Sequence, residues 1–343
     1  LLLGFTNVAF VHLPLIWWWA CLCLPLSVLF NYGTKLLLGL NAITWLNRAN
    51  AFQPFLLFLF AVTLFLNKNH WPPHTRLTLT YIAWLCSFMG AAIFALIVAY
   101  QLIQNRDGIK WRFHRDEWRG MIRYGTWLSV ASAINIVNYR TDFWFVLAYW
   151  PALTSEYSIA VTASEVLLQI SGSITTVVFT RMTGSSREDA IHITELSVRH
   201  TLIASILAAV PMYLVFPWLI VFAYGHKYVG AVIPFLILLP GLIFRSSSNV
   251  LIQYATNQMG SPKTSIWMNG VSAAINALVC LFLVPTLHTI GAAVASTLSY
   301  ILSFGIYVVW FGQVNKVDAS RLYLIQGADL KPYFSIAKRL FGR

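Results

Sequence analysis

The chain has 343 residues, of which 58% are hydrophobic and only 10% are charged, and its mean hydropathy is +0.69. A soluble domain of ordinary composition carries about a quarter charged residues, because its surface must face water. The composition therefore excludes a soluble enzyme and predicts a polytopic membrane protein. The net charge of +12 indicates orientation in a membrane rather than nucleic-acid binding, because Lys and Arg collect in the cytoplasmic loops of membrane proteins.

Hydrophobic runs predict the membrane spans of an all-α protein, since about twenty apolar residues cross a bilayer core. In chain order the runs are roughly 13–44, 54–66, 77–103, 124–150, 157–180, 200–223, 229–256, 264–284 and 289–312. Pro25 and Lys35 leave open whether the first run is one kinked helix or two. Residues 1–12 resemble the end of an earlier span.

The connections between these runs alternate in charge. One set, which includes 105–123, 181–200 and the tail after 313, holds seventeen Lys and Arg, whereas the alternate set holds three. This bias predicts a multi-pass protein of the plasma (inner) membrane with the first set and the C-terminus in the cytoplasm. The basic, aromatic stretches KWRFHRDEWRGMIRYG (110–125) and DLKPYFSIAKRLFGR (329–343) are expected to lie on membrane lipids at that face.

Two passages of the chain resemble each other, LLLGLNAITWLNRANAF (36–52) and IQYATNQMGSPKTSIW (252–267). Each has an Asn near a helix end and then a short loop with one basic residue. By the span count they are six helices apart, which is compatible with parallel six-helix halves. We therefore expect residues 1–123 to hold the last helices of an incomplete N-terminal bundle and a basic linker. Residues 124–312 would form a C-terminal six-helix bundle, and 313–343 a cytoplasmic amphipathic tail.

Three stretches in the second half carry a family resemblance. The segment from Met121 to Leu167 has a Tyr–Gly entry (Tyr124, Gly125), a mid-helix Asp142 and the turn EYSIA at 156–160. FAYGHKYVGAVIPFLILLPG (222–241) and LVPTLHTIGAAVASTLSY (283–300) follow in the same order. This series resembles the polysaccharide-biosynthesis (O-antigen, lipid-linked oligosaccharide) flippases of the multidrug/oligosaccharidyl-lipid/polysaccharide exporter superfamily. Glu156 departs from the small residue usual in that family.

The resemblance implies two six-helix bundles around a central cavity. It also implies translocation of an undecaprenyl-pyrophosphate-linked oligosaccharide across the plasma membrane for surface polysaccharide synthesis, with other polysaccharide-assembly proteins as partners. The physical problem fits, because a glycan and a pyrophosphate need a cationic, hydrated path through hydrocarbon while the lipid tail can remain in the bilayer.

Charged groups inside a span are costly, so they are expected to pair or to face a cavity. Asp142 continues a polar stripe with Asn135 and Asn138 at i, i+3 and i+7, which predicts a face toward water or cargo. We assign Asn135 and Asn138 to substrate binding. Asp142 is the candidate for coupling transport to H+ or Na+.

Arg140 and Asp142 cannot pair well within one helix, since residues i and i+2 point about 200° apart. Counted from the outer turn, Arg140 lies about 15 Å deep and Glu165 on the next predicted helix lies about 12 Å deep. These matching depths predict a structural ion pair, while Arg140 also remains a candidate for substrate binding.

Arg245 lies too deep in its span to reach water fully, about 16 Å from the inner end. It is followed by hydroxyl and amide side chains (RSSSN, 245–249). A guanidinium suits bidentate contact with phosphate, so Arg245 and Lys35 are assigned to the pyrophosphate; a missing carboxylate partner for Arg245 and a headgroup contact for Lys35 are the alternatives.

Rival functions remain open at this point. A multidrug or organic-cation antiporter of the same superfamily would need an acidic, aromatic cavity. A membrane-embedded glycan polymerase or ligase would need a large outer loop, and no predicted outer loop exceeds about a dozen residues. No HExxH, Ser–His–Asp, GxGxxG or Walker pattern occurs, and the four cysteines suggest neither disulfides nor a metal site. We therefore expect a transporter rather than an enzyme, with no cofactor.

Overall fold

The computed structural model describes residues 14–67, 72–104, 115–182, 185–324 and 329, and this part of the chain is helical without strands. The chain divides into two compact units, Leu1–Phe113 and His114–Arg343. Five helical stretches are long and apolar enough to cross a membrane: Thr78–Gln104, Pro151–Val178, Arg187–Tyr224, His226–Gln258 and Pro262–Asn315. The chain is therefore an all-α membrane protein; a pair of six-helix bundles stays a prediction.

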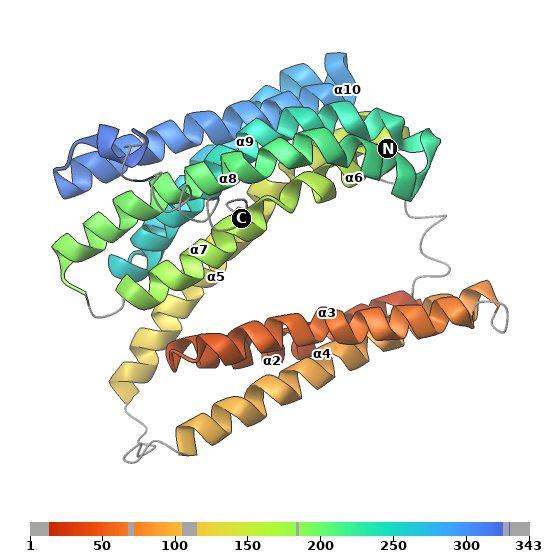
Figure 1. The fold of residues 1–343 in the computed structure, drawn as a ribbon, viewed down its shortest axis with the longest axis horizontal. Coiled ribbons are helices and arrows are strands. Elements are labelled where there is room, and N and C mark those ends of the chain that lie inside the picture. Colours follow the sequence, from red (N-terminus) through yellow and green to blue (C-terminus); the bar gives the residue numbers. More distant parts are fainter. Residues whose placement is uncertain (1–13, 68–71, 105–114, 183–184, 325–328, 330–343) are drawn as a thin grey trace, which may run out of the picture. The chain divides into compact units, whose positions relative to one another are not determined.

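The N-terminal unit contains α2 (Pro14–Gly39), α3 (Ile43–Leu66) and α4 (Pro73–Gln104). Helix α4 packs against both α2 and α3 (Figure 1). Small side chains at the contact, such as Ala49 and Ala95, are fully buried and allow the helices to approach closely. The first hydrophobic run forms one helix, because α2 continues through Pro25.

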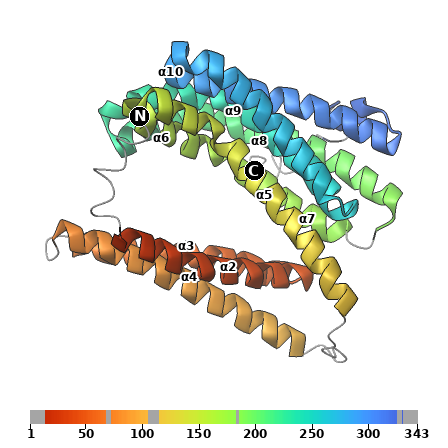
Figure 2. The ribbon, with the colours of Figure 1, turned by 180° about the vertical axis from the view of Figure 1, so that it is seen from behind.

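The C-terminal unit contains α5 (Arg115–Tyr149), α6 (Thr154–Glu165), α7 (Leu168–Met182), α8 (Arg187–Tyr224), α9 (Val232–Gln253) and α10 (Pro262–Asn315). Helix α10 packs against α5 and α9, α8 packs against α9, and α7 packs against both α8 and α9 (Figures 1 and 2). Short 3₁₀ turns, η1 (Pro151–Leu153) and η2 (His226–Ala231), lead into α6 and α9. The predicted span 157–180 is thus divided between α6 and α7.

Helix α10 bends sharply at His288, whose backbone angles are φ 56° and ψ −133°. The bend separates a first arm (262–287) from a second arm (289–315), so the two predicted spans 264–284 and 289–312 correspond to the two arms. The arms approach closely beside the bend. A Cβ atom on Gly291 would lie 2.2 Å from the backbone oxygen of Leu283, which only glycine avoids.

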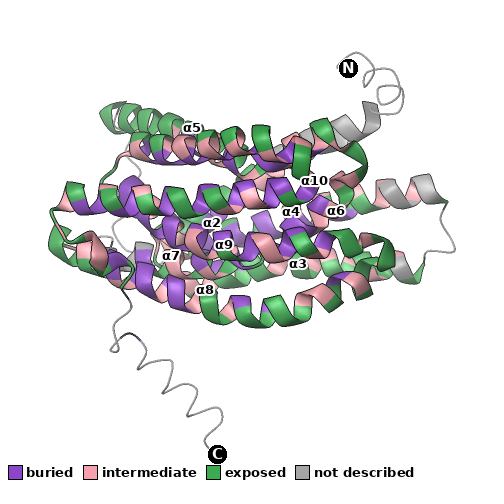
Figure 3. Ribbon diagram, turned by 90° about the horizontal axis from the view of Figure 1, so that it is seen from above, coloured by how far each residue is buried: buried purple, intermediate pink, exposed green. Residues whose placement is uncertain are grey.

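The distribution of polar residues is inverted relative to a soluble protein. Trp218 is 81% exposed and Phe222 is 88% exposed, whereas Ser246, Ser247 and Ser248 on α9 are fully buried. Exposed positions follow the outer faces of the helices and buried positions the faces between them (Figure 3). Apolar surface outside and polar side chains between helices are what a bilayer environment selects.

The two similar passages of the sequence form similar turns. The connections between their helices span residues 40–42 and 259–261, each with one left-handed residue, Asn41 (φ 55°) or Gly260 (φ 60°). The second turn follows a π-helical segment, η3 (Tyr254–Gln258). The similarity between the two passages is therefore confined to these turns. Of the interfacial stretch predicted at 110–125, residues 115–125 form the beginning of a helix, α5 (Arg115–Tyr149), and 110–114 lie outside the described residues; of 329–343 only Asp329 is described.

The segment after α10 returns to the helix bundle. It contains a 3₁₀ turn, η4 (Ala319–Leu322), that Asp318 caps by accepting a hydrogen bond from the backbone N–H of Ser320. Arg199 on α8 then forms a buried ion pair with Asp329, with Nε 2.8 Å from Oδ2. Its guanidinium also donates to the backbone oxygen of Arg321. The end of the described chain is therefore fastened to α8.

Candidate binding cavity in the C-terminal unit

A polar cavity of about 330 Å³ lies in the C-terminal unit; it is open on one side and lined by α5, α7, α9, η3 and the first arm of α10. Hydroxyl and amide groups dominate its lining, and none of the described lining residues is charged. The polar lining residues are Ser132, Asn135, Tyr139, Ser171, Thr175, Asn249, Gln253, Thr256, Ser265 and Asn269. Such a surface can donate and accept hydrogen bonds in many directions, which suits hydroxyl-rich cargo.

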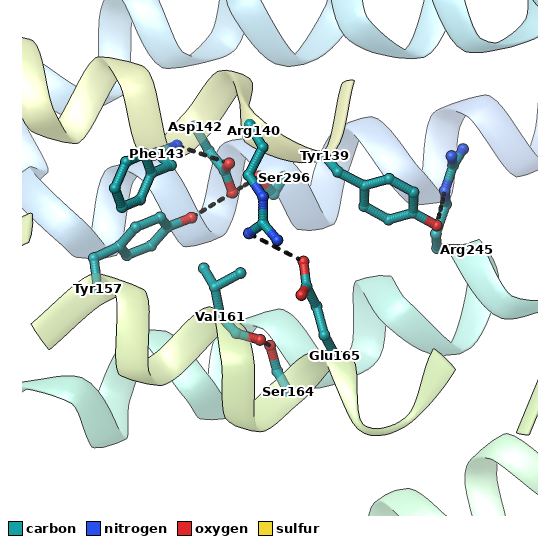
Figure 4. A network of polar contacts seen from close by, with 10 residues as sticks. All are labelled: Tyr139, Arg140, Asp142, Phe143, Tyr157, Val161, Ser164, Glu165, Arg245 and Ser296. Atoms are coloured by element: carbon teal, nitrogen blue, oxygen red, sulfur yellow. Dashed lines mark hydrogen bonds and ion pairs between the residues drawn. The ribbon is translucent and has the colours of Figure 1, made fainter. Parts of the chain in front are cut away.

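Arg245 lies directly behind this wall and is 1% exposed. Its Nη2 atom donates to Oδ1 of Asn135 at 2.5 Å and to Oδ1 of Asn269 at 3.0 Å, and its Nε donates to the hydroxyl of Tyr139 at 3.1 Å. The guanidinium also lies 4.6 Å from the centroid of the Tyr139 ring (Figure 4). All three partners line the cavity.

The positive charge of Arg245 is not neutralised by a carboxylate within the described residues. Arg245 takes part in neither the Arg140–Glu165 nor the Arg199–Asp329 ion pair. The Nη1 atom of Arg245 is buried without a hydrogen-bond partner. Because guanidinium stays protonated in proteins, the uncharged wall has a full positive charge immediately behind it.

Neighbouring side chains fix the wall. Asn269 donates from Nδ2 to the backbone oxygen of Ser265 at 3.0 Å, which leaves its Oδ1 directed at Arg245. Asn249 donates to the hydroxyl of Ser171 at 3.3 Å and so joins α9 to α7 across the cavity. These bonds set which amide oxygens face the guanidinium, and the remaining groups stay available to a ligand.

The predicted stripe of Asn135, Asn138 and Asp142 does not face the cavity as a whole. Asn135 lines it, but Asn138 and Asp142 do not. Asn138 is fully buried, and neither side-chain amide atom has a hydrogen-bond partner. The interpretation that Asn138 and Asp142 face water or cargo is therefore wrong for this structure, because the second arm of α10 covers that side of α5.

Asp142 instead joins three helices and is 3% exposed. Its Oδ2 accepts hydrogen bonds from the Tyr157 hydroxyl of α6 at 2.5 Å and from the Ser296 hydroxyl of α10 at 2.7 Å. Its Oδ1 accepts from the backbone N–H of Phe143 at 2.8 Å (Figure 4). A carboxylate with three donors is a strong cross-link between packed helices.

The ion pair expected between Arg140 and Glu165 is present. Nη1 of Arg140 lies 3.4 Å from Oε1 of Glu165, and the side chains are 46% and 26% exposed (Figure 4). Arg140 does not line the polar cavity. The structure therefore supports the structural role of Arg140 in the ion pair, and it does not place Arg140 where it would contact a substrate in this cavity.

Lys35 lies on α2 of the N-terminal unit and is exposed. It contributes nothing to the cavity of the C-terminal unit. Tyr139 and Asn269 were not singled out from the sequence, although both contact Arg245. The polar residues Asn269, Ser272 and Asn276, at i, i+3 and i+7 within the apolar run 264–284, carried the signal that could have found Asn269.

The described residues contain no group of three or more His, Cys, Asp or Glu that could hold a metal ion. Comparison with known proteins adds no identity: no family model, no curated protein and no solved structure matches the chain. The cavity and its chemistry are therefore the basis for a functional assignment.

Proposed function

We propose that this protein is a flippase for a lipid-linked oligosaccharide of the undecaprenyl-pyrophosphate class, acting in the plasma membrane for surface polysaccharide synthesis. The observation that carries the proposal is the buried Arg245, whose charge no described carboxylate neutralises, behind an uncharged wall of hydroxyls and amides. Membrane lipids and other polysaccharide-assembly proteins are the further partners in this proposal.

The cavity chemistry supports an anionic, hydroxylated cargo. A positive charge in a low-dielectric environment exerts a strong field, because water screens it poorly. The field of Arg245 reaches the cavity through Asn135, Tyr139 and Asn269, and therefore favours a phosphate there. Serine, threonine and amide groups bind sugar hydroxyls, while a prenyl tail can remain in the bilayer.

The same chemistry disfavours the organic-cation antiporter among the rival functions. A cation-binding cavity would need carboxylates or an exposed aromatic cage, whereas the described residues that line this cavity include no carboxylate. The volume of about 330 Å³ lies in the range of small-ligand sites and accommodates only part of a glycan. The remainder would occupy space outside this unit.

Coupling to H+ or Na+ at Asp142 is a separate part of the proposal. Asp142 does not line the cavity, so an ion there would act through the packing of α5, α6 and α10. Replacement by Asn should then remove the ion dependence of flipping. Unchanged ion dependence in Asp142→Asn would exclude this role.

The direct test is flipping of a fluorescent undecaprenyl-pyrophosphate disaccharide in proteoliposomes, followed by chemical quenching of the outer leaflet. Arg245→Gln keeps a hydrogen-bond donor for the Asn oxygens but removes the charge. We expect a fall in rate of about tenfold to a hundredfold, the equivalent of one charged hydrogen bond. The flipping rate of Arg245→Lys should lie between those of the wild-type chain and Arg245→Gln.

Arg140→Gln is the matched control, because it also removes an intramembrane arginine but one that Glu165 neutralises. Its flipping rate should stay near that of the wild-type chain. Full flipping by Arg245→Gln, or accumulation of an organic cation dye in place of the lipid, would contradict the proposed function.

A further inference from the structure

A second, smaller cavity of about 240 Å³ lies where the start of α5 meets the connection between α9 and α10. It shares no lining residue with the polar cavity. Its lining residues are Gly120, Arg123, Tyr124, Trp127, Gly260, Ser261, Pro262 and Lys263. Two cations and two aromatic rings thus meet in one cleft from segments far apart in the sequence.

Both cations are exposed and free of carboxylates. Neither Arg123 nor Lys263 forms an ion pair with an acidic residue in the described part of the chain. Lys263 instead places Nζ 4.9 Å from the centroid of the Trp127 ring. Asp116 and Glu117, in the first turn of α5, do not line the cleft. The cleft therefore carries two positive charges that are open to an anion.

A hydrogen bond joins the two sides of the cleft, and the dipole of α10 adds to its positive potential. The Tyr124 hydroxyl donates to the backbone oxygen of Thr256 at 2.9 Å, which fastens α5 to η3. Helix α10 begins at Pro262 with no acidic residue in its first turn. The positive end of its helix dipole is consequently not compensated there.

A neighbouring hollow of about 380 Å³ is lined by Lys263, Thr264, Trp267 and Trp310. Lys263 thus lines both the cleft beside Arg123 and this neighbouring hollow beside the two tryptophans. Tryptophan concentrates at the level of lipid headgroups, and basic pockets between helices on the cytoplasmic side bind anionic headgroups. The charge bias of the loops places this end of the unit at that side.

We propose that the cleft between α5 and α10 binds the headgroup of an anionic phospholipid of the inner leaflet. The phosphate lies between Arg123 and Lys263, and the glycerol and upper acyl chains lie against Trp267 and Trp310. Arg suits bidentate contact with phosphate oxygens and Lys supplies a point charge. A bound lipid bridges the third turn of α5 and the first turn of α10, and both helices contribute to the wall of the polar cavity.

The test is native mass spectrometry of the full chain, released from nanodiscs of phosphatidylcholine alone or mixed with phosphatidylglycerol. Wild-type protein should retain phosphatidylglycerol in preference to phosphatidylcholine. Arg123→Gln and Lys263→Gln should each weaken retention about fivefold, the equivalent of one basic residue near an anionic surface. Lys263→Arg should restore it.

Lys227→Gln is the matched control, since Lys227 also lies over an aromatic ring, with Nζ 4.8 Å from the centroid of Tyr228, but lines no described cavity. It should leave retention unchanged, and circular dichroism should show equal helix content in all variants. Equal loss in Lys227→Gln would overturn the proposal, as would displacement of the lipid by inorganic pyrophosphate at low concentration, which would identify a soluble ligand.

Discussion

Arg245 donates from Nη2 to Oδ1 of Asn135 at 2.5 Å, so a full positive charge is held by a neutral amide that also lines the polar cavity. A carboxylate at this position would neutralise the arginine and stabilise the fold. The amide keeps the charge available at the expense of stability. This relationship is typical of functional sites, where groups are held in unfavourable surroundings.

Asn135→Asp should therefore raise stability and lower transport. The new carboxylate would form a charge-assisted pair with Arg245, for which we expect a gain of about 1–2 kcal/mol in the free energy of unfolding. Flipping of the pyrophosphate lipid should fall, because the field at the cavity is neutralised. Reversible unfolding in SDS and the proteoliposome assay measure the two effects.

Thr175→Asp is the control for this prediction. It adds a carboxylate to the same cavity, but on α7, at a side chain that donates to the backbone oxygens of Ser171 and Gly172 and not to a partner of Arg245. It should lower stability, because a carboxylate there gains no cation partner. A gain in stability from Thr175→Asp equal to that from Asn135→Asp would show that pairing with Arg245 is not the cause.

The bond between Asp142 and Tyr157 should make a measurable contribution to stability. Tyr157→Phe removes one of three donors to a buried carboxylate, for which we expect a loss of about 1.5–3 kcal/mol. It should leave the ion dependence of flipping intact, whereas Asp142→Asn should remove it. Loss of ion dependence in both variants would mean that damaged packing, rather than ion binding, explains the effect.

The Arg140–Glu165 ion pair should contribute little to the free energy of unfolding. Its side chains are partly exposed, and interhelical polar pairs in membranes average about 0.6 kcal/mol in double-mutant cycles. We expect a coupling energy of that size between Arg140→Gln and Glu165→Gln, measured by unfolding in SDS. A coupling above about 2 kcal/mol would contradict this estimate, since it exceeds what such cycles have given.

The Arg199–Asp329 pair should behave differently, because it is buried, with side chains 8% and 5% exposed. Asp329→Ala leaves an unpaired charge on α8, and we expect a loss of about 3–5 kcal/mol. Arg199→Met combined with Asp329→Ala should recover part of that loss. If the loss in the free energy of unfolding in the double variant equals the sum of the losses in the single variants, the ion pair is not the cause of the loss.

Gly291→Ala should distort the bend in α10. Its Cβ would lie 2.2 Å from a backbone oxygen that cannot move away easily, so we expect a loss of about 1–3 kcal/mol. Gly305→Ala on the second arm is the control, because nothing lies within 4 Å of its Cβ. That variant should be neutral or more stable, in line with the helix propensity of Ala. Equal losses in both would exclude the close approach as the cause.

The sequence predicted those features that depend on one helix or on two consecutive helices. The two spans of α10 follow from its hydrophobic runs, and the Arg140–Glu165 contact follows from depth along two connected helices. The environment of Asp142 could not be predicted, because Ser296 approaches from a helix 154 residues away. Periodicity shows that residues share a face, but it does not show whether water or another polar helix lies opposite.

The division of the predicted span 157–180 has a similar origin. Hydropathy is nearly uniform through the sequence, whereas the helix ends at Glu165 and resumes at Leu168, where Leu167 is fully buried in the core. Tertiary packing decides such breaks, and hydropathy does not detect them. Likewise, Lys35 and Arg245 share a chemical type but lie in different units.

The C-terminal unit is fastened on both sides of its polar cavity. On one side, the single carboxylate of Asp142 on α5 accepts hydrogen bonds from α6 and from the second arm of α10. Helix α7 begins beyond the break at 166–167, supplies Ser171 and Thr175 to the cavity, and is joined to α9 by the Asn249–Ser171 bond at 3.3 Å. The turn at 166–167 keeps hydrogen bonds across the break, from the Leu167 N–H to the Ser164 oxygen and from the Gln169 N–H to the Val166 oxygen, both at 3.1 Å. The part of the cavity wall that α7 supplies is therefore held from α6 at one end and from α9 at its side.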